Sequence, residues 1–542
     1  AFLPVSRYLS SSSSSSSISS DHRSPTSNRS CCNSSDDSLS PQGRDSSLSD
    51  ILVNGTGLRN WHLNPGIEKP RQIIPNHHNL AATSSPATAS ATRKNAHFSD
   101  DDLEAEQGRT FKQSALYLDS DVPPELFDFL LHKECKLEKT VVPNSSSNAS
   151  RKSRRKKKLD KTDTVDLNFL LLQCAEAVSN NELRRANSLL IQIRQSSSPF
   201  GDAEQRIAHS FANGLEARLT GGTGSRNYYY PATLPSLADK LKAYQMYVAA
   251  APFKKISHFF AHQTILNASE NAARLHIIDF GIYHGFMWPC FMQRLSTRPG
   301  GPPRLRITGV DVPQLGFRPA ERIEETGRRL ADYARRFNVP FEYQAIACKW
   351  ENLQLEDLSI DQDEVLAINC MYRLHNLADE TVSPDNPRDQ VLHTIRKLNP
   401  KVFVLGIVNG TYNAPFFVTR FKEALFHFSA LFDMLETNVE REDEQRRLLE
   451  KHSFEREIHN VISCEGLERV ERPETYKQWR SRNERAGLKL IPLDSDIVKK
   501  AKEKVKKCYH KDFVVDEDGK WLLQGWKGRI LFALSAWKAR EA

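Results

Sequence analysis

The sequence predicts an α/β fold: a doubly wound, mostly parallel sheet with a helical cap subdomain, preceded by a long disordered N-terminal region. Three observations support this prediction. Short apolar runs alternate with helical segments in the second half of the chain. Amphipathic helical stripes precede these runs. Residues 1–160 are rich in Ser and Asn, with Asp, Pro and short basic patches, and such a composition buries too little apolar surface to offset the entropy of ordering.

Two segments stand out in this N-terminal region. In residues 116–131, leucine and aromatic side chains are interleaved with acids, which is typical of segments that fold against the groove of a partner. A short helix packed on the folded domain is the alternative. Residues 151–158 form a basic run that suits acidic import receptors or phosphate backbones, or else a solvated linker. Its nuclear-import candidates are Arg151, Lys152, Arg154, Arg155, Lys156, Lys157 and Lys158.

Composition limits the partners. The formal net charge is +8 and the pI is about 8.9, an excess of base that favours anionic partners only where it is clustered. No apolar run approaches the roughly 20 residues of a membrane span, so we expect no membrane partner. The serine-rich, acid-free start of the chain also fits a transit peptide.

The helical period begins at Val165. Apolar stripes run through residues 165–178, 183–193 and 207–219, and predict three amphipathic helices in front of the sheet. Within the first stripe, residues 167–171 match the co-regulator pattern L-x-x-L-L. An amphipathic core helix produces that match by chance, and this is the interpretation that we favour.

Five apolar runs are predicted as parallel strands, with helices such as Ala320–Phe337 between them. Near the end, residues 520–526 and 529–537 flank Lys527-Gly528 and predict a β-hairpin that adds antiparallel strands. A parallel sheet completed by such a hairpin is methyltransferase-like. The five strands are expected at Leu275–Phe280, Leu305–Val310, Phe341–Ala345, Val365–Cys370 and Val402–Val408.

The first two strands end in acids, Asp279 and Asp311, where a nucleoside would bind in such a sheet. Gly281 and Gly285 follow the first strand, but no G-x-G is present, and Tyr283 and His284 place side chains where a cofactor needs room. The weak cofactor-binding candidates are therefore Asp279, Gly281, Gly285 and Asp311. We expect no cofactor; retained binding of S-adenosylmethionine or a small signalling molecule is the alternative function.

Catalytic and metal motifs give no case for an enzyme. His258 and His262 have i, i+4 spacing, but no third ligand follows at a recognisable distance, so we interpret them as part of a surface helix. The sequence has no P-loop, no G-x-S-x-G and no H-E-x-x-H. His276 alternates within a strand and is interpreted as a core histidine.

Taken together, the motifs resemble those of the GRAS proteins, plant transcriptional regulators, and among them the Scarecrow-like branch. Residues 275–279 resemble the VHIID motif, 415–417 the start of the PFYRE region, 469–472 the RVER element and 535–537 the closing SAW motif. The resembling residues are Leu275, His276, Ile277, Ile278 and Asp279; Pro415, Phe416 and Phe417; Arg469, Val470, Glu471 and Arg472; and Ser535, Ala536 and Trp537.

The resemblance covers residues 163–540. It implies leucine repeat I at about 167–227, a VHIID region at about 246–311, leucine repeat II at about 327–359, a PFYRE region at about 368–462 and a SAW region at about 465–540. It also implies a transcription factor or co-regulator in the nucleus, working with other transcription factors and co-regulators. The resemblance further implies contact with DNA, directly or through a partner, and a homodimer or heterodimer is compatible with the apolar helices.

Two basic elements of the folded region are candidates for phosphate contact. Arg469 and Arg472 either pair with carboxylates, of which Glu465 and Glu474 are near in sequence, or contact phosphate directly. The second candidate is a lysine-rich helix that either faces phosphates or is a solvated helix surface. Its lysines are Lys499, Lys500, Lys502, Lys504, Lys506 and Lys507.

Overall fold

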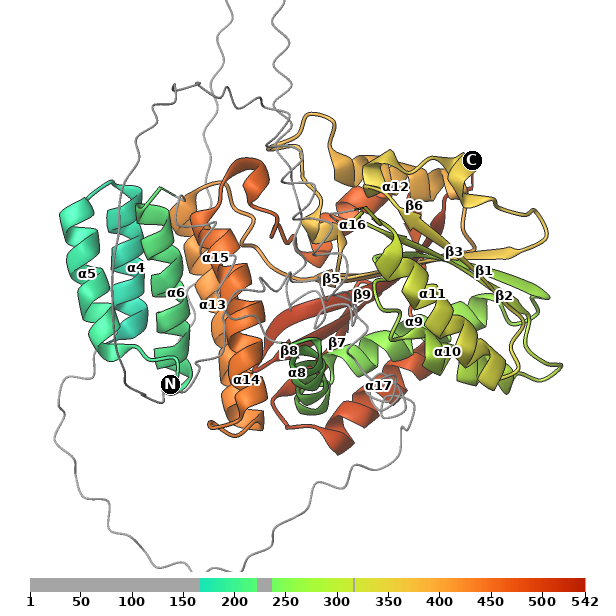
Figure 1. Cartoon of the computed structure of the whole chain (residues 1–542), viewed down its shortest axis with the longest axis horizontal. Helices are drawn as coiled ribbons and strands as arrows, with labels where there is room; N and C mark the ends of the chain where they lie inside the picture. The colour runs from blue at the N-terminus through green and yellow to red at the C-terminus, as the bar shows by residue number, and fades with distance from the viewer. Residues whose placement is uncertain (1–165, 222–235, 315–316, 542) are drawn as a thin grey trace, which may run out of the picture. The chain divides into compact units, whose positions relative to one another are not determined.

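The computed structural model describes residues 166–221, 236–314 and 317–541 (Figure 1). The disordered region expected at 1–160, with its acidic-hydrophobic segment 116–131 and its basic run 151–158, lies outside these ranges. Within the described ranges, no helix is long and apolar enough to cross a membrane.

Nine strands of the described chain form one sheet in the order β3-β2-β1-β4-β5-β9-β8-β7, with β6 paired to the end of β9. β1 to β5 are parallel, whereas β9 runs antiparallel to β5, β6 and β8. The strands are β1 (Arg274–Phe280), β2 (Arg304–Asp311), β3 (Phe341–Ala347), β4 (Val365–Met371), β5 (Val402–Val408), β6 (Leu488–Leu490), β7 (Phe513–Asp518), β8 (Trp521–Trp526) and β9 (Arg529–Ala539).

The sheet lies between two hydrophobic cores. Successive side chains of a strand point to opposite faces, and in β1 Ile277 joins one core while Ile278 joins the other. The first core includes α9 (Phe253–Ala268), α10 (Trp288–Ser296) and α11 (Glu321–Arg336). The second includes α12 (Pro387–Leu398) and α16 (Tyr476–Arg485). Both faces of β1 are therefore covered, as its continuous apolar sequence requires.

The helical cap is an assembly of segments far apart in sequence. α4 (Leu167–Ser179), α5 (Leu183–Ser196) and α6 (Ala203–Leu219) pack together, and α6 also packs on α13 (Phe417–Asn438) and α15 (Glu455–Ser463) (Figure 1). Asp202 and Gln205 form a capping box that begins α6. The remaining helices are α8 (Leu237–Ala250), α14 (Glu444–Leu449) and α17 (Ser495–Cys508), and Glu450–Phe454 continues α14 as a π-helical turn.

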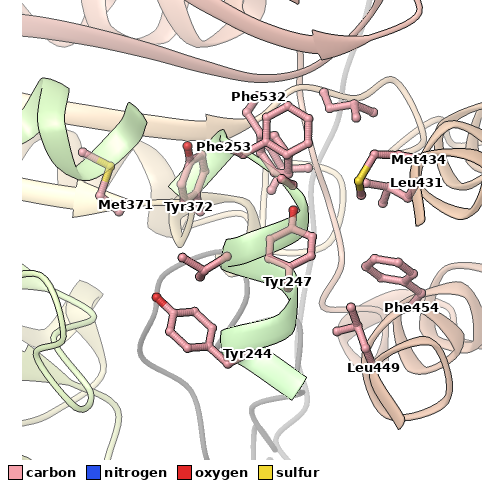
Figure 2. Packing of buried hydrophobic residues seen from close by; sticks show 14 of the residues in the cluster. Tyr244, Tyr247, Phe253, Met371, Tyr372, Leu431, Met434, Leu449, Phe454 and Phe532 are labelled. Carbon is pink, nitrogen blue, oxygen red and sulfur yellow. The ribbon is translucent and has the colours of Figure 1, made fainter. Parts of the chain in front are cut away.

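Aromatic side chains connect the sheet to these helices. Figure 2 shows Tyr247 of α8 between Tyr372 and Phe532 on the sheet side and Leu431 and Phe454 on the helix side. All five side chains are buried in one continuous core. The cap and the sheet thus share a core.

The predicted strands and helices are confirmed in position. The predicted hairpin is also confirmed: Lys527 and Gly528 both have positive φ, at 46° and 82°, which suits a two-residue turn of type I′. β6 and β7 were not predicted. The hairpin inserts β9 beside β5, so that β7 rather than the hairpin forms that edge of the sheet.

Candidate functional site

Two acids meet at the carboxyl ends of β1 and β2, which we call the carboxyl edge. Asp279 and Asp311 are both buried. Asp279 Oδ2 accepts a hydrogen bond from Trp288 Nε1 at 2.7 Å, and its Oδ1 accepts one from Asn369 Nδ2 at 2.7 Å. Since Trp288 begins α10 and Asn369 lies in β4, this carboxyl ties β1 to both elements.

Burial changes the acidity of Asp279. Removal of water raises its pKa, the hydrogen bonds from Asn369 and Trp288 partly oppose this, and the charge of Asp311 adds to the increase. The resulting pKa is about 7. Both of its hydrogen-bond donors, Trp288 and Asn369, are side chains of the protein.

Asp311 is held by cations of the protein itself. Its Oδ2 lies 3.3 Å from Arg322 Nη2, and its Oδ1 lies 3.7 Å from Arg373 Nη2. The backbone N–H of Tyr283 also donates to Oδ2, at 3.2 Å. The acid that would hold ribose hydroxyls in a nucleotide-binding sheet is therefore engaged by two arginines and a backbone amide.

The loop that follows β1 packs beside Asp311. Tyr283 is buried in a left-handed conformation with φ of 46°, and the Arg322 guanidinium stacks over its ring at 3.8 Å. Thr326 donates to the Tyr283 carbonyl oxygen. Tyr283 and His284, predicted to place side chains where a cofactor needs room, are both buried.

The two glycines of this loop let side chains of the protein itself pack closely against the loop backbone. A Cβ on Gly281 would lie 2.8 Å from Arg373 Cγ, and a Cβ on Gly285 would lie 2.9 Å from Thr326 Cγ2. Their φ angles are 91° and 64°, which suit glycine. The four cofactor candidates thus meet at one edge as expected, and side chains of β4 and α11 and their neighbours occupy that edge.

The VHIID-like residues serve the sheet. Leu275 and Ile277 are buried in one core and Ile278 in the other. His276 Nε2 lies 2.8 Å from Thr308 Oγ1, and burial lowers the pKa of His276 to about 4. The imidazole is therefore neutral at physiological pH, as the interpretation as a core histidine requires.

The expected surface location of His258 and His262 is wrong. Both side chains are buried on α9, where their rings stack at 6.2 Å. His262 also contacts Phe291, because α9 packs against the sheet and α10 rather than facing solvent. In the described part of the chain, no three His, Cys, Asp or Glu side chains are grouped as metal ligands.

The RVER-like residues form a buried network. Arg472 Nη1 lies 3.4 Å from Asp379 Oδ1, and Arg472 Nη2 donates to the Gly466 carbonyl at 2.6 Å. Arg469 Nη1 donates to Asn413 Oδ1 at 2.9 Å. The carboxylate partner is thus Asp379 instead of Glu465 or Glu474.

The other members of this region are also paired internally. Glu465 pairs with Arg420, and Glu474 pairs with Arg482 at 2.7 Å. Glu471 lies 3.0 Å from His375 Nε2. Val470 is half-buried, and its backbone N–H donates to Asn460. Direct phosphate contact by Arg469 or Arg472 does not fit this burial.

The SAW residues lie in β9. Ser535, Ala536 and Trp537 are buried, and Trp537 Nε1 donates to Ser535 Oγ at 2.8 Å. Trp537 packs edge-on against Trp521 of β8 with 6.0 Å between ring centroids. Trp537 belongs to the second core and Ala536 to the first, so this motif contributes to both faces of the strand that lies between β5 and β8.

The lysine-rich helix is α17. Its apolar side, which includes Ile497 and Val505, is buried. Lys500 lies 3.9 Å from Asp496, and Lys502 lies 3.3 Å from Glu517. The side chains of Lys499, Lys506 and Lys507 are exposed, while Lys502 and Lys504 are half-exposed.

Three residues that contact Asp279 or Asp311 at the carboxyl edge were not predicted from the sequence. Arg322 and Arg373 were not identified, although each carries a signal: Arg322 flanks the apolar stripe of α11, and Arg373 comes two residues after an apolar strand. Asn369 was missed as well, since a polar residue inside an apolar strand is a signal only once its partner is known.

Fold and edge together define a methyltransferase-like domain with a helical cap, in which the protein's own side chains close the nucleoside edge. The GRAS domain family model matches residues 167–538. The chain belongs to this family.

The chain is 58% identical to Scarecrow-like protein 9 of Arabidopsis thaliana over 379 residues, which is 70% of this chain and 52% of that protein. It is 34% identical to Scarecrow-like transcription factor PAT1 of the same plant, over 69% of this chain and 76% of that protein. The solved structure of SCL7 from Oryza sativa matches 69% of this chain and all of that chain with a TM-score of 0.60 at 29% identity. The chain thus spans about half of the first relative's length.

Replacing Asp279 by Asn is expected to change how stability depends on pH. The folded-state pKa of about 7 lies above the ordinary value of 3.8, so the folded state binds this proton more tightly. The resulting stabilisation is complete below pH ~4 and is lost as pH rises through 7, by up to about 4 kcal/mol. Denaturant unfolding between pH 4.5 and 7.5 should show this decline in the wild type and a flatter profile in the variant. Parallel profiles would contradict it.

Replacing Arg472 by Ala is expected to lower the free energy of unfolding by about 3–5 kcal/mol, because it leaves Asp379 buried without its cation. Arg485→Ala is the matched control, since Arg485 is exposed, and should change stability by no more than about 0.5 kcal/mol. Urea unfolding of both variants measures the difference; equal effects would show that the Arg472 network does not stabilise the fold.

Proposed function

We propose that this protein is a nuclear transcriptional regulator without enzymatic activity, which acts through protein partners and contacts DNA. The observation that carries the proposal is the closed carboxyl edge in a member of the GRAS domain family. A sheet of this type usually serves a ligand at that edge, whereas here Tyr283, Arg322 and Arg373 take up the space. The name of one relative, a Scarecrow-like transcription factor, supports a role in transcription.

Protein partners have an apolar surface to bind on the cap. Phe169 on α4 is 55% exposed, and Leu183 and Ile191 on α5 are 51% and 60% exposed. A second protein, including another copy of this chain, would bury these side chains if it bound this side of α4 and α5. Residues 116–131 are proposed as a further partner-binding segment.

DNA contact is proposed for the solvent side of α17. Its exposed lysines Lys499, Lys506 and Lys507 lie on one amphipathic helix whose apolar side is anchored in the core. Lysine side chains release counterions from DNA when they neutralise its phosphates, which makes such contact independent of sequence and sensitive to salt. Sequence specificity would then come from other contacts or from a partner.

S-adenosylmethionine is expected to leave the melting temperature of the full chain unchanged, because Tyr283, Arg322 and Arg373 pack around Asp311 at this edge. Differential scanning fluorimetry with millimolar ligand, beside an active methyltransferase as the positive control, measures this. A concentration-dependent increase in melting temperature would contradict the proposal and favour a ligand-binding function.

Replacing the seven basic residues of 151–158 by Gln is expected to move a fluorescent fusion of the full chain from the nucleus to the cytoplasm, since an import receptor would lose its basic contacts. Fluorescence imaging in plant cells gives the nuclear fraction. The control replaces lysines and arginines of the cap, Arg185, Lys242 and Lys422, in the same way. An unchanged nuclear fraction in the first variant would exclude this run as the import signal.

A further inference from the structure

A group of cations lies at the edge of the sheet formed by β6 and the end of β9, beside the end of α12 (Figure 1). We call this group the edge patch. It consists of Arg396 and Lys397 on α12, Lys489 on β6, and Lys538 and Arg540 at the end of β9.

Two lysines of the edge patch face each other across the strands. β6 and β9 are antiparallel, and Lys489 is directly opposite Lys538. Their neighbours Leu488 and Leu490 are paired with Ala539 and Trp537 and are buried. Alternation therefore places both lysines on the other face, where directly opposed like charges destabilise a strand pair.

Two arginines lie at the end of this strand pair: Arg540 directly follows β9, and Arg396 reaches it from α12, which covers the buried face opposite the two lysines. Arg396 Nη2 donates to the Arg540 carbonyl oxygen at 3.1 Å, and Arg540 N donates to the Gly487 carbonyl at 2.9 Å, just before β6. Arg540 and Lys397 are exposed. The contact of Arg396 with the backbone fixes its guanidinium at the end of the strand pair.

Little negative charge balances this group. In the ranges that the structure describes, no carboxylate pairs with Arg396, Lys397, Lys489 or Arg540. Lys538 Nζ lies 3.3 Å from Glu541, whose side chain is 91% exposed. Such an exposed surface pair is weak and screened by solvent. By contrast, the lysines Lys500 and Lys502 of α17 have acidic neighbours on α17 and β7.

We propose that the edge patch binds the phosphate backbone of duplex DNA. This proposal rests on the proposed function, in which the protein contacts DNA. Phosphate groups would separate and neutralise the opposed lysines, which converts a destabilising arrangement in the free protein into a favourable one in the complex. A duplex carries one charge per about 1.7 Å of its axis, so its backbone can engage several cations spaced along a strand edge at once. Arginine adds bidentate contacts to phosphate oxygens.

The test measures binding of the full chain to a labelled random duplex by fluorescence anisotropy over a range of salt concentrations. The edge-patch variant carries Arg396→Gln, Lys489→Gln, Lys538→Gln and Arg540→Gln. The expected result is at least a tenfold weaker association constant at low salt. Its logarithm should also depend less steeply on the logarithm of salt, by about 0.9 for each phosphate that the variant no longer neutralises.

The matched control removes the same formal charge from four exposed cations that sit in local ion pairs: Arg185→Gln, Lys242→Gln, Arg328→Gln and Arg335→Gln. Its salt dependence should equal that of the wild type. Equal losses in both variants would overturn the proposal, because net charge would then explain them. Melting temperatures verify folding; the edge-patch variant should melt no lower than the wild type, since a like-charge pair has been removed.

A third variant separates this inference from the proposed function. It carries Lys499→Gln, Lys500→Gln, Lys506→Gln and Lys507→Gln. If only this variant loses binding, α17 contacts DNA and the edge patch does not. If the wild type itself shows no salt-dependent binding, direct DNA contact fails altogether and the edge-patch proposal fails with it.

Lysine acetylation provides the position-specific measurement. Duplex DNA should protect Lys489 and Lys538 from acetic anhydride in the wild-type full chain, as detected by mass spectrometry, while Lys242 stays reactive. Protection by polyglutamate but not by duplex would overturn the proposal in favour of an acidic protein partner.

Discussion

Asp311 places a carboxylate at the carboxyl end of β2 without access to water, and the arrangement of the carboxyl edge follows from the need to compensate it. An unpaired buried charge is costly, and pairing with hydrogen-bonded cations is the usual solution. Arg322 from α11 and Arg373 from the end of β4 supply that pairing. Because Arg322 also stacks on Tyr283, the loop after β1 is held against α11. Closure of the nucleoside edge is thus a consequence of charge compensation.

The same principle connects the distant parts of the fold. Arg206 of α6 is buried and pairs with Glu450 at 3.0 Å and with Glu436 at 2.6 Å, which joins the cap to the π-helical turn and to α13. Arg388 of α12 pairs with Glu474 at 3.0 Å, just before α16. These arginines cross between segments that local sequence does not link. Arg206 thus holds segments of the cap together and Arg388 holds α12 to the segment before α16, while cap and sheet are joined by the core that they share.

The five parallel strands and the hairpin were predictable because each depends on local pattern, whereas β6 and β7 were not predicted. Apolar runs bounded by turns indicated the parallel strands, and Lys527-Gly528 indicated the hairpin. The partners of the buried charges were not predictable. Asp379 lies 93 residues before Arg472 in sequence, and nothing local distinguishes it from Glu474, which is two residues away. α9 was misjudged for a related reason: His258 and His262 are polar by composition, but their burial is decided by the packing of α10 and the sheet against α9, which the sequence of the helix itself does not show.

The buried and the exposed cations of this domain differ in their surroundings. Inside the domain, Arg322, Arg472 and Arg388 have carboxylates within about 3.5 Å, and their positive charge is used in holding segments together. At the β6–β9 edge, Lys489 and Lys538 face each other with one exposed carboxylate nearby. The buried cations hold segments of the domain together; the exposed lysines lie at an edge strand, where such charges also discourage pairing with another chain. They are solvated in the free protein, and under the proposal their mutual repulsion is reduced further when the phosphates of a duplex neutralise them.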